Sequence, residues 1–511
     1  MIDLRSTYRA SEDTSRIAII ALVLFIALAM TGTIFLSPEL VLASVFGVAF
    51  VIFTFARPTW SLAALLWYLP FEPFLLKWIP DGVYIYARYA SEGVIYLLAL
   101  VALILVFTGK RRYTSTRIDL PFVLFVVVLL ATALINFVPP LTAALGVRQI
   151  LRFILLFFVV IIMRPETKWI KTVLYGLFLI LAFQILLGYG QALFGEPLDE
   201  FLLPSEQRIY GEIQLTTGTE QFWDPGQRVF GTMGRYDQLG TWMAFLMLII
   251  VSILYEGRLR KYRKPLGALL LFAILGIALT YSRSSWFGFL LGFLFITIWI
   301  KRDRRVMWVS GLTVGALALY LAFSGLVVHQ LTETSDQDYA ERFFEAFSYE
   351  RWRSEYYGLG RLFWIVQTPT AVVPASAVFG HGPAMFGGGA VAALGNTLVY
   401  DEVGLPFGVY GTEGYIDNNW LSLWGETGTL GLGLYLWMYI GLFLACLSVW
   451  HRSRKGFTRA LALGVAAAML AVMLNAFLAT FLEVRTLAPY LWVFGGLVIV
   501  MGEREKLLEN S

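Results

Sequence analysis

The sequence GHGPAMFGGG occupies residues 380–389, and DNNWLSLWGETGTLGL follows at residues 417–432. The second stretch runs directly into an unbroken apolar run, so it marks the place where a long loop meets the start of a membrane helix. Glycine-rich backbone, a histidine and a group of Asp and Asn residues gather at this junction. The combination suits a reaction site at a membrane surface, with the rest of the chain as its lipid-embedded scaffold.

The composition is that of a polytopic membrane protein. Of the 511 residues, 58% are apolar and 14% are charged, and the mean hydropathy is +0.71, whereas a soluble protein has about a quarter charged residues. The net charge of +4 does not indicate nucleic-acid binding, because in a membrane protein the sidedness of charge matters more than its sum. The single cysteine, Cys446, lies in an apolar run, which excludes a disulfide framework and a cysteine-based metal site within the chain.

Membrane spans can be recognised because each needs about 20 mostly apolar residues. On that template we predict an all-α fold with about 12–14 transmembrane helices. The first apolar run lacks a small-residue cleavage signature, so we expect a span there and not a signal peptide. The third run is the weakest, since Pro70, Glu72 and Pro73 interrupt it. The apolar runs are residues 17–36, 40–56, 60–79, 91–107, 118–138, 144–163, 171–194, 238–255, 266–281, 286–300, 306–327, 424–450, 460–482 and 487–501.

Basic residues collect in alternate short loops. The loops at residues 109–117, 164–171, 256–264, 301–305 and 451–459 are basic, and the loops between them are not. Because Lys and Arg in short loops mark the cytoplasmic side, we predict that these five loops are cytoplasmic. The chain would then be a multi-pass protein of the plasma (inner) membrane with both termini in the cytoplasm.

Two long loops are predicted to face outward, at residues 195–237 and 328–418. The second has about 90 residues, far more than an ordinary connection, so we expect it to carry function or structure of its own. Its stretch 338–366 has helical spacing with aromatic residues on one face, which predicts one or two amphipathic helices over the membrane face. No internal repeat or linker is evident. We therefore predict a single membrane domain, residues 1–511, with the loop 328–418 inserted in it.

Several arginines lie at the predicted outer ends of apolar runs. Charge at such places is costly and by default marks a functional cavity. Because the planar guanidinium binds phosphate bidentately, we interpret Arg228 and Arg283 as a diphosphate clamp. The alternative is that each arginine caps a helix, pairs with a neighbouring acid or reaches the lipid headgroups. The arginines concerned are Arg148, Arg152, Arg228, Arg235, Arg283 and Arg361.

The junction itself holds further candidates. Asp417 or Asn418 can cap the following helix, whose N-terminus also favours a nearby anion, so Asn418 and Asn419 are candidates for substrate binding. Glu426, about two turns further on, either pairs with a buried arginine or takes part in the site. His381, flanked by glycines, either satisfies a turn or takes part in chemistry. No His and carboxylate pair stands at ligand spacing, so we expect no metal ion and no cofactor.

At these residues the sequence resembles the O-antigen ligase and polymerase superfamily, membrane glycosyltransferases that take glycans from undecaprenyl diphosphate. In the ligases the segment before the late span usually reads His-Asn, whereas here Asp417 precedes Asn418. This departure favours a polysaccharide polymerase over a lipid A-core ligase. The matching pieces cover roughly the second half of the chain, in the family's order: RVFGTMG at residues 228–234, TYSRSSWFG at 280–288, GRLFW at 360–364, GHGPAMF at 380–386 and DNNWLSLWGETGTLGL at 417–432.

The resemblance implies metal-independent, inverting glycosyl transfer at the outer face of the membrane. The donor would be an undecaprenyl-diphosphate-linked glycan, the acceptor a glycan or lipid A-core, and membrane lipids would surround both. Arg228 and Arg283 would stabilise the departing diphosphate, and Asp417, or else His381, would accept the proton of the attacking hydroxyl. The remaining candidates for substrate binding are Arg148, Arg152, Arg235, Arg361, Asn418, Asn419 and Glu426.

Two other classes of function stay open. A transporter or flippase for lipid-linked glycans predicts charged residues near the span centres and two related halves of the chain, whereas the ionisable residues here cluster at outer ends. A sensor or assembly protein would tolerate neutralisation of Arg283 without loss of polysaccharide.

Overall fold

The computed structural model describes residues 37–204, 208–210, 213–216, 227–256, 262–331 and 338–507. Within these ranges the chain is helical except for one short antiparallel hairpin, β1 (Arg208–Tyr210) and β2 (Ile213–Thr216), which belongs to the first long outer loop. The predicted all-α membrane fold is confirmed. The predicted span at residues 17–36 lies outside the described residues.

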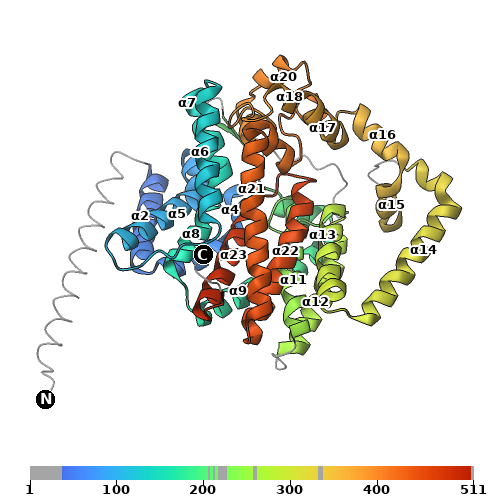
Figure 1. Cartoon of the computed structure of the whole chain (residues 1–511), viewed down its shortest axis with the longest axis horizontal. Helices are drawn as coiled ribbons and strands as arrows, with labels where there is room; N and C mark the ends of the chain where they lie inside the picture. The colour runs from blue at the N-terminus through green and yellow to red at the C-terminus, as the bar shows by residue number, and fades with distance from the viewer. Residues whose placement is uncertain are drawn as a thin grey trace, which may run out of the picture.

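The helices form one bundle in which α11 and α22 are the most deeply buried spans and pack side by side (Figure 1). The helices up to α11 are α2 (Pro38–Ala56), α3 (Pro58–Tyr68), α4 (Glu72–Lys77), α5 (Asp81–Phe107), α6 (Asp119–Ile135), α7 (Pro140–Leu151), α8 (Leu155–Met163), α9 (Thr167–Phe194), α10 (Glu196–Leu202) and α11 (Tyr236–Glu256). Those that follow are α12 (Arg263–Leu279), α13 (Arg283–Leu294) with its π-helical end η2 (Phe295–Ile300), α14 (Arg304–His329), α15 (Tyr339–Phe344), η3 (Glu345–Phe347), α16 (Tyr349–Tyr357), α17 (Arg361–Gln367), η4 (Thr368–Val372), α18 (Val373–Ala375), α19 (Gly389–Leu394), α20 (Leu398–Glu402), η5 (Val409–Gly411), α21 (Asn419–Arg452), α22 (Gly456–Ala476) and α23 (Ala488–Arg504).

The described residues contain fewer full-length spans than the 12–14 predicted. Eight helices are long and apolar enough to cross a membrane, or nine if α7 and α8, which meet at 51°, count as one broken span. The helices α6, α12 and α23 have 17 residues each. The weak run at residues 60–79 divides into α3 and α4, with Pro70 between them and Pro73 in the first turn of α4, because proline cannot continue a helix from its interior.

The large outer loop leaves the bundle along α14 and returns over its upper end. The stretch 338–366 forms three short helices, α15, α16 and α17, where one or two were predicted. Asp338 begins α15 with a capping box, since its side chain accepts the backbone N–H of Glu341 and the Glu341 side chain accepts that of Asp338. Figure 1 shows α14 standing apart from the other spans, and none of its apolar window is buried.

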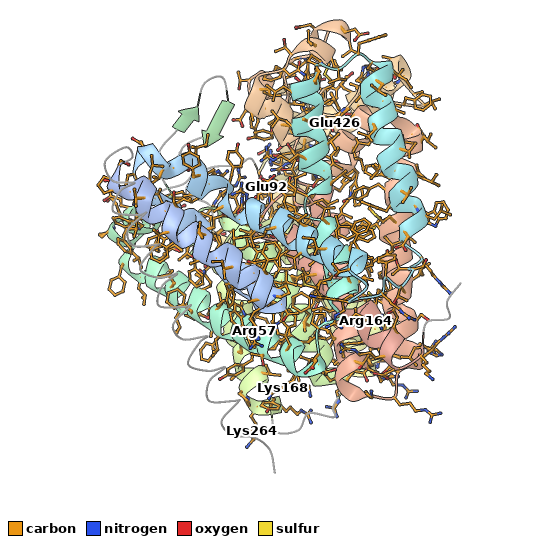
Figure 2. The ribbon with its side chains drawn as sticks, turned by 90° about the vertical axis from the view of Figure 1, so that its left-hand side faces the viewer. Arg57, Glu92, Arg164, Lys168, Lys264 and Glu426 are labelled. Atoms are coloured by element: carbon orange, nitrogen blue, oxygen red, sulfur yellow. The ribbon has the colours of Figure 1, made fainter. Side chains whose placement is uncertain are left out.

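The described residues of the five basic loops meet at one end of the bundle. Arg164 of the second loop donates from Nη1 to Thr114 of the first at 2.7 Å. Lys171, at the end of the second loop, lies 5.1 Å from the ring centroid of Phe457 in the fifth. In Figure 2 the labelled Arg164 and Lys264 lie toward the end opposite Glu426. The shared end agrees with the predicted alternation of loops, and its assignment to the cytoplasm stays a prediction.

Glu256 joins the third, fourth and fifth basic loops at this end. Its carboxylate accepts from Lys301 Nζ at 2.5 Å, from Arg459 Nε at 3.0 Å and from Trp450 Nε1 at 2.7 Å. Both cations also lie over the Trp450 ring. One buried carboxylate therefore joins the ends of α11, η2, α21 and the start of α22.

We expect Glu256→Ala to lower the melting temperature of the purified protein. The substitution removes the shared acceptor of two cations and an indole, and each lost hydrogen bond to a charged group is worth about 1.5–3 kcal/mol. The matched control is Glu402→Ala at an exposed position of α20, which should leave the melting temperature unchanged. Equal thermal unfolding of the two variants would contradict this role for Glu256.

Candidate functional site

The start of α21 is fixed by two asparagines. Asn418 is the N-cap: its Oδ1 accepts from the backbone N–H of Leu421 at 3.0 Å, and its Nδ2 donates to the carbonyl of Phe477 at 2.9 Å. Asn419 Oδ1 accepts from the backbone N–H of Leu482 at 2.8 Å. Of the two capping candidates in the sequence, Asn418 takes the role. Both side chains join the start of α21 to the segment between α22 and α23.

The glycine-rich stretch 380–389 lies directly on the first two turns of α21. The backbone N–H groups of His381 and Gly382 donate to the carbonyls of Gly425 and Glu426, at 2.9 and 2.8 Å. Gly428 interrupts the helix at φ 67° and ψ −174°, and a Cβ on it would collide with the carbonyl of Val378. Glycine at position 428 therefore permits both the break in the helix and the close approach of the two backbones.

The side chains of His381 and Glu426 help to hold this contact. His381 is 6% exposed, and its Nε2 lies 3.0 Å from the carbonyl oxygen of Val372. The buried Glu426 carboxylate accepts from the backbone N–H groups of Ala384 and Phe386. Within the described part of the chain Glu426 makes no ion pair with an arginine, the pairing that the sequence suggested.

Asp417 and Arg361 form an ion pair beside the start of α21. Asp417 Oδ2 lies 2.9 Å from Arg361 Nη2 and 3.1 Å from Nε. Arg361 is the first residue of α17, and its backbone N–H donates to Glu355 at 2.8 Å. Burial alone would lower the pKa of the Arg361 guanidinium, but Asp417 and Glu355 raise that pKa well above its usual value. The pair joins the large outer loop to the start of α21.

Arg235 and Arg228 approach the same pair from the segment before α11. Arg235 binds Asp237, with Nε 3.1 Å from Oδ1, and Asp237, with a smaller contribution from Asp417, raises the pKa of Arg235. The buried Arg228 lies over the ring of Tyr236, 4.9 Å from its centroid. Tyr236 in turn interacts electrostatically with Arg361. Arg235 and Arg361 therefore both interact with Asp417, and Arg228 is linked to them through Tyr236.

Arg283 enters this neighbourhood through a second carboxylate. It is the first residue of α13, and its Nη1 lies 2.9 Å from Oε1 of the fully buried Glu345. Glu345 also binds Arg342 at 3.2 Å and Arg351 at 2.6 Å. Arg351 pairs with Glu355, the carboxylate that holds the backbone of Arg361. Three guanidinium groups therefore converge on one buried carboxylate, which leaves this part of the site electropositive.

Arg148 and Arg152 do not join these contacts. Both bind Glu92 of α5, Arg152 Nη1 at 3.1 Å. Gln149, between them in sequence, donates to Glu483. The structure thus divides the predicted arginines into two groups, with Arg228, Arg235, Arg283 and Arg361 in the first.

The sequence reasoning missed the carboxylates that organise the arginines. Glu92 stands inside an apolar run, and an acid in such a run indicates a buried partner. Glu345 and Arg351 lie in the stretch 338–366, which the sequence pattern described by its aromatic residues and not by its charged ones. Among the described residues, no group of three or more His, Cys, Asp or Glu side chains is arranged to hold a metal ion.

Backbone strain occurs in these motifs and beside them. Of the nine non-glycine residues with positive φ in the described ranges, three lie in the motifs, and Leu359, which adjoins the motif 360–364, and Tyr410 of the long loop bring the number to five. Such conformations cost roughly 1–3 kcal/mol each and persist where surrounding contacts impose them, often at functional sites. The carbonyl of Leu359 also accepts from the backbone N–H of Tyr410 at 3.0 Å, which links two of the five. They are Tyr281, Leu359, Ala384, Tyr410 and Asp417.

We expect Gly428→Ala to disrupt the site and Gly433→Ala to be tolerated. At position 428 a side chain meets both a positive φ and the backbone of Val378, whereas nothing lies within 4 Å of a Cβ at position 433 of the same helix. Gly428→Ala should therefore lower the melting temperature and the yield of folded protein. The measurement is thermal unfolding of both purified variants, and similar curves for the two would show that the break at Gly428 is not required.

Comparison with known proteins identifies the region that holds this site. Residues 268–436 match the family model described as O-Antigen ligase. The match runs from α12 into α21 and includes Arg283, Arg361, His381 and Asp417, while Arg228 precedes it. None of the curated proteins compared with the chain matches it. The chain is thus a multi-pass membrane protein that carries an O-antigen ligase domain at residues 268–436.

Proposed function

We propose that the protein is an inverting, metal-independent glycosyltransferase that takes a glycan from undecaprenyl diphosphate at the outer face of the plasma membrane. The observation that carries the proposal is the Asp417–Arg361 pair beside the start of α21, with Arg235 interacting with Asp417 and Arg228 linked to the pair through Tyr236. The pair brings together a carboxylate that can accept a proton and cations that can receive a leaving diphosphate. The match of residues 268–436 to the O-antigen ligase model supports the same chemistry.

In the proposed reaction a sugar hydroxyl of the acceptor attacks the anomeric carbon of the donor. The new C–O bond forms as the bond from that carbon to the diphosphate oxygen breaks, and the diphosphate leaves with the bonding electrons. Cations held in place beforehand lower the barrier, because negative charge grows on the diphosphate in the transition state. Arg228 and Arg283 supply this charge, and Arg235 and Arg361 add to the field around them.

Asp417 receives the proton of the attacking hydroxyl. Its carboxylate is positioned by the two bonds from Arg361, and its backbone is fixed at φ 52° next to the capped Asn418. His381 is the second candidate for this role. We place it second because its Nε2 lies against a backbone carbonyl and its ring is buried in the contact with α21.

We favour a polysaccharide polymerase over a lipid A-core ligase. Asp417 stands where the ligases usually carry a histidine. The pairing of Asp417 with Arg361 supports a carboxylate base at this position, because both arginine bonds end on Oδ2 and so orient the carboxylate.

Arg228→Ala and Arg283→Ala should each lower the rate of glycan transfer by about 10²–10³-fold, the usual effect of removing one preorganised stabiliser of a developing anion. The measurement is product formation by purified protein from a defined undecaprenyl-diphosphate oligosaccharide with a glycan acceptor. Arg353→Ala is the matched control, because Arg353 is an outer-loop arginine whose side chain is 56% exposed. Wild-type rates in both test variants would refute the proposed transfer.

Asp417→Asn should lower turnover by roughly 10²–10⁴-fold while donor binding is retained. Arg361→Gln should have a smaller effect, because it removes the partner that positions the carboxylate. The double variant should be no slower than Asp417→Asn alone, since residues that act as one unit are not additive. Fully additive losses in transfer rate would show that Arg361 acts independently of Asp417.

An experiment in cells distinguishes glycan transfer from transport by a flippase. A strain with Arg283→Ala should display shortened polysaccharide and accumulate lipid-linked precursor on the outer face of the membrane. Accumulation on the cytoplasmic face would favour transport over transfer.

A further inference from the structure

A second group of arginines lies at the meeting point of α4, α5, α7 and the segment between α22 and α23. We call Arg148, Arg152 and Arg485, with the carboxylates of Glu72 and Glu92, the α7 arginine cluster. None of these residues lies in the matched range 268–436. Figure 2 shows Glu92 between Glu426 and the basic end of the bundle, with side-chain nitrogen atoms gathered beside it.

The two carboxylates of the cluster are buried and already bound. Glu92 receives the Nε and Nη2 groups of Arg148 and, at 3.1 Å, the Nη1 group of Arg152. Glu72 binds Arg485 Nη1 at 3.0 Å. Three guanidinium groups therefore face two carboxylates, and one positive charge is left over. Arg88 lies close enough to interact electrostatically with Arg485, Glu72 and Arg152, so it adds to the positive field.

The charge left over is poorly solvated. The side chains of Arg152 and Arg485 are 11% and 13% exposed, and that of Arg148 is 27% exposed. Arg152 Nε is buried and has no hydrogen-bond partner among the described residues. A buried cation without a counter-charge is costly, as is a buried donor without an acceptor. An anion bound at Arg152 would remove both costs.

Glu483 is the nearest further carboxylate, but its contacts lie elsewhere. Its Oε2 accepts from Gln149 and, at 3.4 Å, from the backbone N–H of Gly389. Arg152 reaches only its backbone carbonyl, at 2.7 Å. Glu483 therefore interacts with Arg152 electrostatically, but its carboxylate makes no hydrogen bond to the guanidinium.

The cluster is joined to the proposed site by a single segment. Leu482 donates its backbone N–H to Asn419 at the start of α21, and Thr486 donates to Gln238, the residue after the Asp237 that binds Arg235. Arg485 lies between these two contacts in sequence. A ligand at the α7 arginine cluster would thus lie one short segment away from the residues around Asp417.

From this geometry we infer that the α7 arginine cluster binds the carboxylate of an acidic sugar, such as a hexuronate, in the glycan that the protein handles. The inference rests on the proposed function and names a class of its substrate. A carboxylate carries one negative charge, which equals the excess of the cluster, and its planar pair of oxygens fits the guanidinium fork. Arg88 and Glu483, which both interact electrostatically with Arg152, add one charge of each sign and leave this excess unchanged. A diphosphate would bring more negative charge than that excess.

The test is binding of two fluorescent probes, a trisaccharide ending in glucuronic acid and its neutral carboxyl-reduced form, to protein in phosphatidylcholine nanodiscs. Wild type should bind the acidic probe at least about tenfold more tightly, the factor expected for one hydrogen bond between charged groups. Arg152→Gln should abolish this preference, Arg152→Lys should retain part of it, and Arg353→Gln should leave it unchanged. Equal binding of both probes by wild type, or a preference that survives in Arg152→Gln, would overturn the inference.

Folding does not obscure this test. Arg152→Gln loses the ion pair with Glu92 and the hydrogen bond to the carbonyl of Glu483, so we expect a lower melting temperature than that of wild type. The preference is a ratio of two affinities for the same variant, measured below its melting temperature, so a loss of stability does not mimic a loss of preference.

Two further measurements distinguish a sugar carboxylate from a lipid phosphate or free phosphate as the bound anion. Nanodiscs with phosphatidylglycerol, or added inorganic phosphate, should compete with the acidic probe less well than free glucuronate does. Stronger competition by either would assign the cluster to a phosphate group. Arg283→Ala should keep the preference for the acidic probe, so loss of transfer and loss of carboxylate binding can be told apart.

Discussion

The contact between the glycine-rich stretch 380–389 and the first two turns of α21 determines where the charged groups of this protein lie. It is made of backbone, with the N–H groups of His381 and Gly382 on the carbonyls of Gly425 and Glu426. Gly428 makes it possible, because only a residue without a Cβ permits both the positive φ and the approach of Val378. Asn418 then sets the first residue of the helix, and Asp417 next to it is turned toward Arg361. A rigid backbone contact thus positions a carboxylate at the end of a long loop.

In the charged clusters of the protein, one buried carboxylate is shared by several arginines. Glu345 binds three arginines, and Glu92 binds Arg148 and Arg152 and lies 3.9 Å from Arg485. Sharing keeps the guanidinium groups oriented and largely desolvated without neutralising them fully. Preorganised charge of this kind stabilises a developing anion better than water does, because it does not have to reorient during the reaction. Each buried acid therefore serves mainly to hold cations in place, and the excess of arginine is the basis of the anion binding that we propose for this end of the bundle.

Much of this arrangement could be predicted from the sequence, and the exceptions have physical causes. The helical membrane fold follows from composition, and the cap at Asn418 follows from local chemistry that depends on a few neighbouring residues. The described residues hold fewer full-length spans than predicted, because the run at residues 60–79 is broken at Pro70 and Pro73 and because α6, α12 and α23 have only 17 residues each. The role of Glu426 was not predictable, since its carboxylate accepts from the backbone N–H groups of Ala384 and Phe386, which lie some 40 residues earlier in the chain. The contact of both Arg152 and Arg485 with Glu92 was equally unpredictable, because contacts between distant segments leave no periodic signal in the sequence.

The position of Arg283 is compatible with both a structural role and the catalytic role that we propose. In the structure its guanidinium binds Glu345, which suggests at first that it is occupied and unable to hold a diphosphate. Glu345, however, also binds Arg342 and Arg351 and so does not depend on Arg283 for its counter-charge. A diphosphate that drew Arg283 toward Arg228 would leave the buried carboxylate with two cations. The Arg283 side chain is only 17% exposed, so most of the cost of removing it from water has been met during folding. Exchange of one anion for another at Arg283 is therefore less costly than burial of a fully hydrated arginine would be.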